Sequence, residues 1–197
     1  DTEAAKVAGL TNLQYLDFGF GDIEAYTPDD PGANNNDITD LSLFESLPSL
    51  SYLNIAGNPN LTDLSALTHY PALTLLLMGR NGATSPAFYA PLGQMTSLVG
   101  LYIAWGGVTD SILANIAASN DLQYLFLSGN ELTTLNGLAN ETSLNTVWLR
   151  YNKISNISAL QSKTNLAYVV LDYNRLRDVA PLVNNSGIGG DDLVTVG

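Results

Sequence analysis

A nine-residue phrase, Leu-x-x-Leu-x-Leu-x-x-Asn, recurs seven times in the 197-residue chain, with Val, Ile, Met or Phe allowed at the later apolar positions. The copies begin at Leu13, Leu50, Leu73, Leu98, Leu122, Leu144 and Leu166, and the interval between them settles to 22 residues toward the C-terminus. A recurring period of this length indicates a solenoid, in which each repeat buries its apolar face only against its neighbours. We therefore predict one domain over residues 1–197.

Each phrase predicts one short strand of a parallel sheet, because its apolar residues alternate and an Asn or Gly then turns the chain. The return segments 154–160 and 176–182 are short enough for 3₁₀ turns, whereas the longer fourth repeat has room for a helix over 111–118, capped by Asp110. A degenerate eighth copy at 192–197 predicts a last strand with Val194 and Val196 at its inner positions. Segment 24–37, rich in Pro, Gly, Asn and Asp, predicts a loop inserted in the first repeat.

The last position of the phrase is asparagine in five of the seven copies, and Gly21 and Gly106 occupy the other two. A buried amide side chain at this turn can bond backbone groups that strand pairing leaves unpaired. We therefore predict a structural ladder of stacked asparagines, formed by Asn58, Asn81, Asn130, Asn152 and Asn174.

Residues 122–135 (LQYLFLSGNELTTL) and 144–157 (LNTVWLRYNKISNI) resemble the 22-residue repeats of bacterial internalin-type proteins, and the resemblance covers nearly the whole chain. It implies an α/β leucine-rich-repeat solenoid, a curved horseshoe with a parallel concave β-sheet and a convex side of 3₁₀ turns and short helices. It also implies a non-catalytic, adhesin-like module that binds a protein, on a secreted or cell-surface bacterial chain. A cytosolic phosphatase-regulating scaffold has a similar repeat, so an intracellular scaffold that regulates an enzyme stays open as an alternative.

Strand alternation predicts that the third, fifth, seventh and eighth residues of each phrase face the concavity or its rim. These 28 positions hold 11 of the 17 aromatic residues, whereas a random scatter would place about 2 there. Aromatic residues also suit strands in general, but both tryptophans fall on this face, and Tyr, Trp and Arg dominate interface energetics. The predicted partner-binding residues are Tyr52, Leu75, Leu77, Arg80, Tyr102, Trp105, Tyr124, Phe126, Trp148, Arg150, Tyr151, Tyr168 and Tyr173.

The centre of this predicted surface is formed by Tyr102, Trp105, Phe126, Trp148 and Tyr151. Arg80 and Arg150 are its cations, which can anchor a carboxylate or stack on rings within the protein. A carbohydrate ligand is an open alternative, because aromatic platforms also stack on sugars. Leu75 and Leu77 make the face more apolar than a glycan site requires.

Catalytic and metal-binding chemistry is weakly represented. The single histidine, His69, is predicted to lie at the surface. Without cysteine or a second histidine, the chain has no Ser/His or Cys/His catalytic arrangement and no set of zinc ligands. We therefore expect neither an enzyme nor a bound cofactor. Asp29, Asp30 and Asp37 offer oxygen ligands for calcium, but their spacing fits no calcium loop, which favours a solvated loop.

Charge and hydropathy exclude two kinds of partner. The net charge of −12 repels the phosphates of nucleic acids, and no apolar run reaches the roughly 20 residues of a membrane span. The first ten residues do not resemble a signal peptide. The absence of cysteine fits a secreted bacterial protein without excluding a cytosolic one, so we predict an extracellular or bacterial cell-surface location, with the cytoplasm as the alternative.

Overall fold

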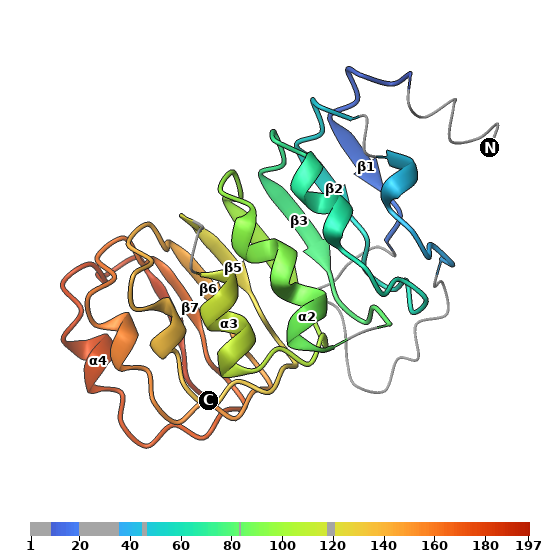
Figure 1. Ribbon diagram of the computed structural model, residues 1–197. Coiled ribbons are helices and arrows are strands. Elements are labelled where there is room, and N and C mark those ends of the chain that lie inside the picture. The colour runs from blue at the N-terminus through green and yellow to red at the C-terminus, as the bar shows by residue number, and fades with distance from the viewer. Residues whose placement is uncertain (1–8, 20–35, 45–46, 83, 118–120) are drawn as a thin grey trace.

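The computed structural model describes residues 9–19, 36–44, 47–82, 84–117 and 121–197, which coil into a solenoid (Figure 1). Within them, eight strands form one parallel sheet whose spatial order is the chain order, β1 to β8. The strands are β1 (Tyr15–Asp17), β2 (Tyr52–Asn54), β3 (Leu75–Met78), β4 (Gly100–Ile103), β5 (Tyr124–Phe126), β6 (Thr146–Trp148), β7 (Tyr168–Val170) and β8 (Leu193–Thr195). Each of β1 to β7 begins two residues after the first leucine of its phrase.

The register of the sheet stacks equivalent residues of successive repeats. Leu76 pairs with Leu101, which in turn pairs with Leu125, and each of these side chains is fully buried. Val194 of β8 continues this inner column and packs against the core. Val196, predicted as a second inner residue, is instead 44% exposed, because β8 ends one residue earlier and has a neighbouring strand on one side only in the described part of the chain.

The convex side consists of short helical segments that lie in front of the sheet in Figure 1 and confirm the predicted mixture of 3₁₀ turns and short helices. Most are a single turn, because a return of about ten residues leaves no room for more. They are η2 (Ser42–Phe44), η3 (Ser65–His69), α2 (Pro86–Tyr89), η4 (Ala90–Gln94), α3 (Asp110–Ile116), η5 (Asn136–Leu138), η6 (Ser158–Leu160) and α4 (Ala180–Val183).

The predicted cap of the fourth-repeat helix is wrong. Helix α3 already includes Asp110, and Thr109 occupies the N-cap position. The Asp110 carboxylate instead accepts hydrogen bonds from the N–H of Thr133 at 2.8 Å and from the N–H of Thr134 at 3.2 Å, both in the next coil. The Asp110 side chain therefore bonds the next coil, whereas the local sequence pattern predicts that it caps the helix.

The asparagines of the phrase connect each coil to the one before it. Asn130, which is 4% exposed, donates from Nδ2 to the carbonyl of Leu127 in its own coil at 2.9 Å and of Ile103 in the preceding coil at 2.7 Å. Its Oδ1 accepts from the N–H of Gly106 at 3.0 Å and of Val108 at 2.9 Å. Each such side chain satisfies backbone groups that the strands leave unpaired.

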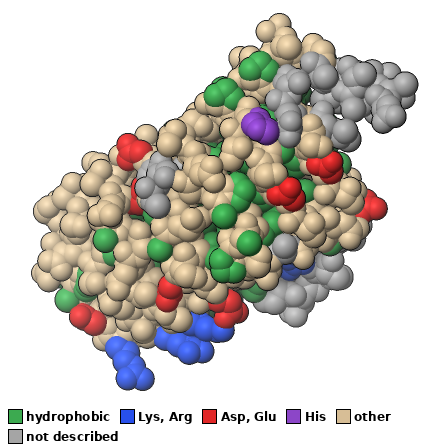
Figure 2. All heavy atoms as spheres, in the orientation of Figure 1, with side chains coloured by type: hydrophobic (Ala, Val, Ile, Leu, Met, Phe, Trp, Pro, Cys, Tyr) green, Lys and Arg blue, Asp and Glu red, His purple; other side chains and the backbone are tan. Residues whose placement is uncertain are grey.

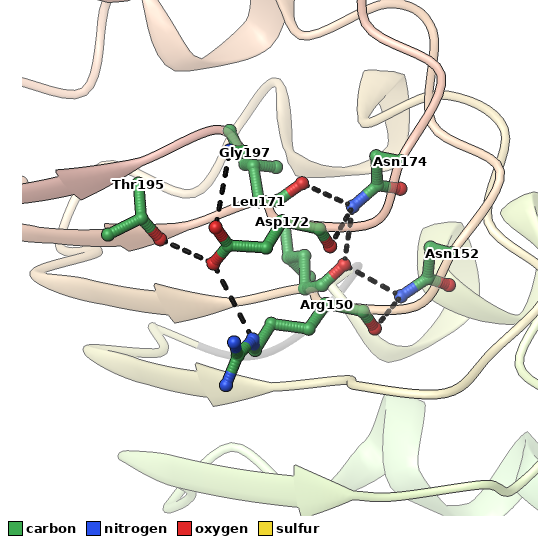
Figure 3. A network of polar contacts seen from close by, with 8 residues as sticks. Arg150, Asn152, Leu171, Asp172, Asn174, Thr195 and Gly197 are labelled. Carbon is green, nitrogen blue, oxygen red and sulfur yellow. Dashed lines mark hydrogen bonds and ion pairs between the residues drawn. The ribbon is translucent and has the colours of Figure 1, made fainter. Parts of the chain in front are cut away.

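The other ladder positions repeat this geometry with one variation. Asn58, Asn152 and Asn174 each donate to a carbonyl of their own coil and to one of the preceding coil, as Figure 3 shows for Asn174. Asn81 donates to Ile55 at 2.8 Å, but its Oδ1 accepts from Gly79 in its own coil. Gly21 lies outside the described residues.

Substituting Asn130 with Ala leaves two buried N–H groups and two buried carbonyls without this partner. We expect the free energy of unfolding to fall by about 3 kcal/mol, measured by urea denaturation. Asn140→Ala, at an exposed position of the same repeat, is the matched control and should change it by less than about 0.5 kcal/mol. Equal effects of the two substitutions would contradict the structural role of the ladder.

A second buried column, which the sequence analysis missed, lies three residues before the first leucine of the second, third, fourth, sixth and seventh phrases, and Asn185 continues it 22 residues after Lys163. Its members are apolar in the early repeats and polar in the late ones, where Glu141, Lys163 and Asn185 are each at most 3% exposed. Glu141 Oε2 accepts from the N–H of Leu122 at 3.1 Å, and Lys163 Nζ donates to the carbonyl of Ala139 at 2.7 Å. Like the asparagine ladder, these side chains satisfy backbone groups of the preceding coil.

The buried Glu141 predicts a specific dependence of stability on pH. Burial raises its pKa above the ordinary value of 4.5, although the hydrogen bond from Leu122 and the charge of Lys163 act in the opposite direction. Between 4.5 and the raised pKa, the folded protein holds more protons than the unfolded chain, so the contribution of Glu141 to stability falls as pH rises.

Glu141→Gln keeps an acceptor for Leu122 and removes this titration. We therefore expect the free energy of unfolding of the variant, relative to the natural chain, to increase from pH 4 to pH 7 in urea titrations. A difference that stays constant across this interval would show that Glu141 does not titrate differently in the folded state.

Candidate binding surface on the concave sheet

The predicted partner-binding residues all lie on the outward side of the strands or in the turn that follows them. Four are exposed: Tyr124, Tyr151, Tyr168 and Tyr173. The other nine are half-buried: Tyr52, Leu75, Leu77, Arg80, Tyr102, Trp105, Phe126, Trp148 and Arg150. Seven described positions that were expected on this face are buried instead, namely Asn54, Ala56, Gly57, Gly79, Gly100, Thr146 and Val170. Thr146 is flanked in register by the larger Tyr124 and Tyr168.

An inner row of rings comes from the fifth position of three adjacent repeats. Tyr102 of β4, Phe126 of β5 and Trp148 of β6 are paired in register. The rings of Tyr102 and Phe126 are stacked, with centroids 4.0 Å apart and planes 7° apart, and Trp148 follows at 5.2 Å from Phe126. Neighbouring strands lie about 4.8 Å apart, so equivalent aromatic side chains are brought into contact by the sheet itself.

A second row, along the rim of the sheet, comes from the eighth position of the phrase, where the backbone is left-handed. Trp105, Tyr151 and Tyr173 have φ of 54°, 55° and 58°. Arg80, Gly57 and Gly129 share this column and have φ of 50°, 72° and 72°. The left-handed region costs a residue other than glycine about 1–2 kcal/mol, and bulky residues rarely adopt it.

The cause of this conformation is a hydrogen bond between coils. The N–H of Trp105 donates to the carbonyl of Ser128 in the next coil at 3.1 Å, and Tyr151 donates in the same way to Asp172 at 3.2 Å. Gly57 and Gly129 make the equivalent bond, each at 2.9 Å. The sequence analysis missed the strain, and its only signal was the two glycines in the same column as the aromatic residues.

Gly129 makes the rim row continuous. A Cβ at this glycine would lie 2.3 Å from Cδ2 of Trp105, because the indole covers the place that a side chain would occupy. The indole therefore reaches Tyr151, at a centroid distance of 5.9 Å, and Tyr151 stacks on Tyr173 at 4.4 Å with planes 7° apart. We call the two rows together the aromatic ridge, comprising Tyr102, Trp105, Phe126, Trp148, Tyr151 and Tyr173.

Arg150 and Asp172 close the C-terminal end of the ridge (Figure 3). Asp172 accepts hydrogen bonds from the Thr195 hydroxyl at 2.6 Å and the Gly197 N–H at 3.2 Å, and the bond from Thr195 is the main cause that lowers the pKa of this carboxyl. Arg150 Nε lies 3.5 Å from Oδ2 of Asp172, and its guanidinium carbon lies 5.8 Å from the Tyr173 centroid. The Arg150 side chain is still 43% exposed, so it can also meet a ligand.

The convex face differs from the ridge. In Figure 2, which shows the side that bears the helices, hydrophobic side chains form small separate groups, and Lys and Arg gather beside the last coils. His69 is exposed in η3, as predicted.

The described residues contain no group of three His, Cys, Asp or Glu placed to hold a metal ion. Of the weak calcium candidates, Asp37 accepts a hydrogen bond from Asn60, while Asp29 and Asp30 lie outside the described residues. No helix in the described part of the chain is long and apolar enough to cross a membrane.

Comparisons with known proteins agree with this architecture. A family model described as Leucine Rich repeats (2 copies) matches residues 33–69. Internalin C2 of Listeria monocytogenes is 29% identical to the chain with a TM-score of 0.70, over 97% of this chain and 74% of that one. The internalin inlF of the same organism is 25% identical with a TM-score of 0.69, over 93% of this chain and 48% of that one.

A more distant structure, the complex of TLR13 with ssRNA13, shares the fold alone, at 21% identity and a TM-score of 0.57 over 94% of this chain and 29% of that one. A search of curated proteins found no match.

The left-handed rim predicts an unusual order of stability between two variants of Tyr151. Both Tyr151→Gly and Tyr151→Ala remove the ring, and only the alanine keeps a Cβ at positive φ. We therefore expect the glycine variant to be more stable by about 1 kcal/mol in urea unfolding. Tyr124 in strand β5 provides the control, because there the alanine variant should be the more stable one. The same order at both positions would contradict the strain at Tyr151.

Proposed function

We propose that this chain, which is similar in sequence and fold to internalins of Listeria monocytogenes, is a non-catalytic module that binds a protein partner through the aromatic ridge. The observation that carries the proposal is the continuity of the ridge, in which six aromatic side chains from the coils of β4 to β7 contact one another in two rows. Aromatic residues supply most of the binding energy at protein interfaces, and a contiguous apolar surface of this kind usually marks a contact site.

The packing of the ridge also reduces the entropy lost on binding. Trp148 contacts Phe126, and Tyr173 stacks on Tyr151 with the Arg150 guanidinium carbon 5.8 Å from its centroid. Side chains already fixed by their neighbours have little conformational freedom left to lose when a partner docks, so more of the contact energy becomes affinity.

The orientation of the rings favours protein over carbohydrate. A sugar stacks on the open face of an aromatic ring, but the rings of Tyr102 and Phe126 are packed face to face, as are those of Tyr151 and Tyr173. In each pair the two facing ring surfaces are covered, so a sugar cannot stack on them. Such a surface suits the mixture of apolar groups and backbone acceptors that a protein presents.

We propose an extracellular or bacterial cell-surface location, as the resemblance to internalins implies. The alternative, an intracellular scaffold that regulates an enzyme, would use the same ridge on a cytoplasmic partner. Protease treatment of intact source cells separates the two, because a surface protein loses its antibody signal while a cytoplasmic one keeps it.

The ridge predicts a binding defect that leaves the fold intact. Replacing Tyr102 and Trp148 together with Ala should weaken the affinity for a protein partner by about 3 kcal/mol, roughly a hundredfold, because both side chains belong to the inner row. Cell-surface proteins that are retained by binding to the natural chain would be identified by mass spectrometry. The Kd of each purified candidate for the natural chain and for the double variant would then be measured by surface plasmon resonance.

Tyr15→Ala is the matched control, since Tyr15 is an exposed tyrosine of the same sheet outside the ridge. It should retain the partners that the double variant loses, with both variants folded by circular dichroism. Partners bound equally well by the double variant would exclude the ridge as the binding site.

A further inference from the structure

We propose that the aromatic ridge binds an extended, proline-rich segment of the partner in the polyproline II conformation, lying along the solenoid axis across the coils of β4 to β7. The inference rests on the proposed function and adds the chemistry of the partner. It is carried by the hydrogen-bonding groups of the ridge, by its dimensions and by the charge of the chain.

Every polar side-chain group of the ridge can donate a hydrogen bond, and only the tyrosine hydroxyls can also accept one. The indole N–H groups of Trp105 and Trp148 and the hydroxyls of Tyr151 and Tyr173 have no hydrogen-bond partner among the described residues. Arg150 adds a guanidinium on a side chain that is 43% exposed, although its Nε is buried in the ion pair with Asp172, 3.5 Å from Oδ2. Indole and guanidinium groups only donate, so the surface matches a ligand that mainly accepts hydrogen bonds.

The acceptor groups near these donors are already occupied. Asp172, the carboxylate at the end of the ridge, is bonded to Thr195, Gly197 and Arg150. A proline-rich segment fits this imbalance, because proline has a carbonyl but no N–H. The polyproline II helix also leaves all its carbonyls free, since it has no internal hydrogen bonds.

The dimensions of the two rows agree with one turn of that helix. The ring centroids place the ends of the inner row about 9 Å apart at most, and those of the rim row about 10 Å apart at most. A polyproline II turn of three residues rises about 9.3 Å, close to the spacing of two coils at about 4.8 Å each. Residues i and i+3 of the ligand therefore meet the two ends of each row.

In the coils of β6 and β7 the seventh position of the phrase carries Arg150 and Asp172. In the coils of β4 and β5 it carries the short side chains of Ala104 and Ser128, which lie between the fifth and eighth positions. A segment laid over them has one row on each side, in the way that aromatic side chains flank proline-rich ligands in other recognition modules.

The charge of the chain specifies what flanks the prolines. The described residues up to position 63 include four Asp and no Lys or Arg, whereas residues 142–177 contain five Lys and Arg against one Asp. This gradient favours a ligand with Lys or Arg at the end that lies toward the early coils. It also disfavours an acidic peptide, whose carboxylates could otherwise accept hydrogen bonds from the ridge.

The direct test uses a fluorescent peptide of nine prolines with two arginines at one end and measures its anisotropy with the full chain. We expect saturable binding, at least tenfold weaker binding when the prolines are replaced by alanine, and weaker binding when the arginines are replaced by glutamate. Tyr151→Phe keeps the ring and removes the hydroxyl, whereas Trp148→Phe replaces the indole and its N–H with a smaller phenyl ring. Each should weaken binding about fivefold. Tyr15→Phe removes the hydroxyl of an exposed tyrosine in β1, outside the ridge, and should not.

Absence of binding to the proline peptide, or equal binding of the alanine peptide, would overturn this inference. The proposed function would survive that result if the Tyr102 and Trp148 double variant still lost its protein partners, since the ridge would then bind a folded surface. If proline binding occurred but was unaffected by Trp148→Phe, Tyr151→Phe and the double variant, the segment would bind elsewhere and the assignment to the ridge would be wrong.

Discussion

The solenoid depends on one constraint, which is that no coil satisfies its own backbone. Strands of three or four residues pair only with the coils on either side, and the turn that follows each strand is bonded to neighbouring coils through an asparagine side chain and through the N–H of the eighth position. Each coil must therefore repeat the geometry of the previous one. Whatever side chain occupies the fifth or eighth position then stacks on its counterpart, so the aromatic ridge follows from placing rings in two columns.

The same constraint explains which features could be predicted from sequence. Inner residues such as Leu101 and ladder residues such as Asn130 depend only on the period and the residue type, so the repeat specifies both. The left-handed backbone at Trp105 could not be predicted from its residue type, because aromatic residues rarely adopt it. Glu141 and Lys163 were missed because the pattern of apolar residues contains no signal for a charged side chain that bonds the preceding coil.

The orientation of the rings could not be predicted from the sequence for a different reason. The fifth and eighth positions were expected on the concave face, but whether their rings stack depends on which neighbours leave space. Gly129 carries no side chain, and the Trp105 indole takes the vacant place and reaches Tyr151. At Asp110 the local expectation was wrong because a residue suited to cap a helix bonds Thr133 of the next coil instead. In both cases contacts between coils decide the position of the side chain.

In the rim row, the fold requires only the backbone conformation, and the aromatic side chains need a separate explanation. The hydrogen bond that enforces positive φ is made by Gly57 and Gly129 as well as by Trp105 and Tyr151, so coil stacking needs only the backbone at this position. Glycine would make the bond without the steric cost of a Cβ. Stacking between rings offsets part of that cost, since an aromatic pair contributes about 0.5–1.5 kcal/mol, but Trp105 is tilted rather than stacked on Tyr151. Strained residues cluster where a protein binds its ligands, and the rings of the rim are therefore better explained by contact with a partner than by the stability of the coil.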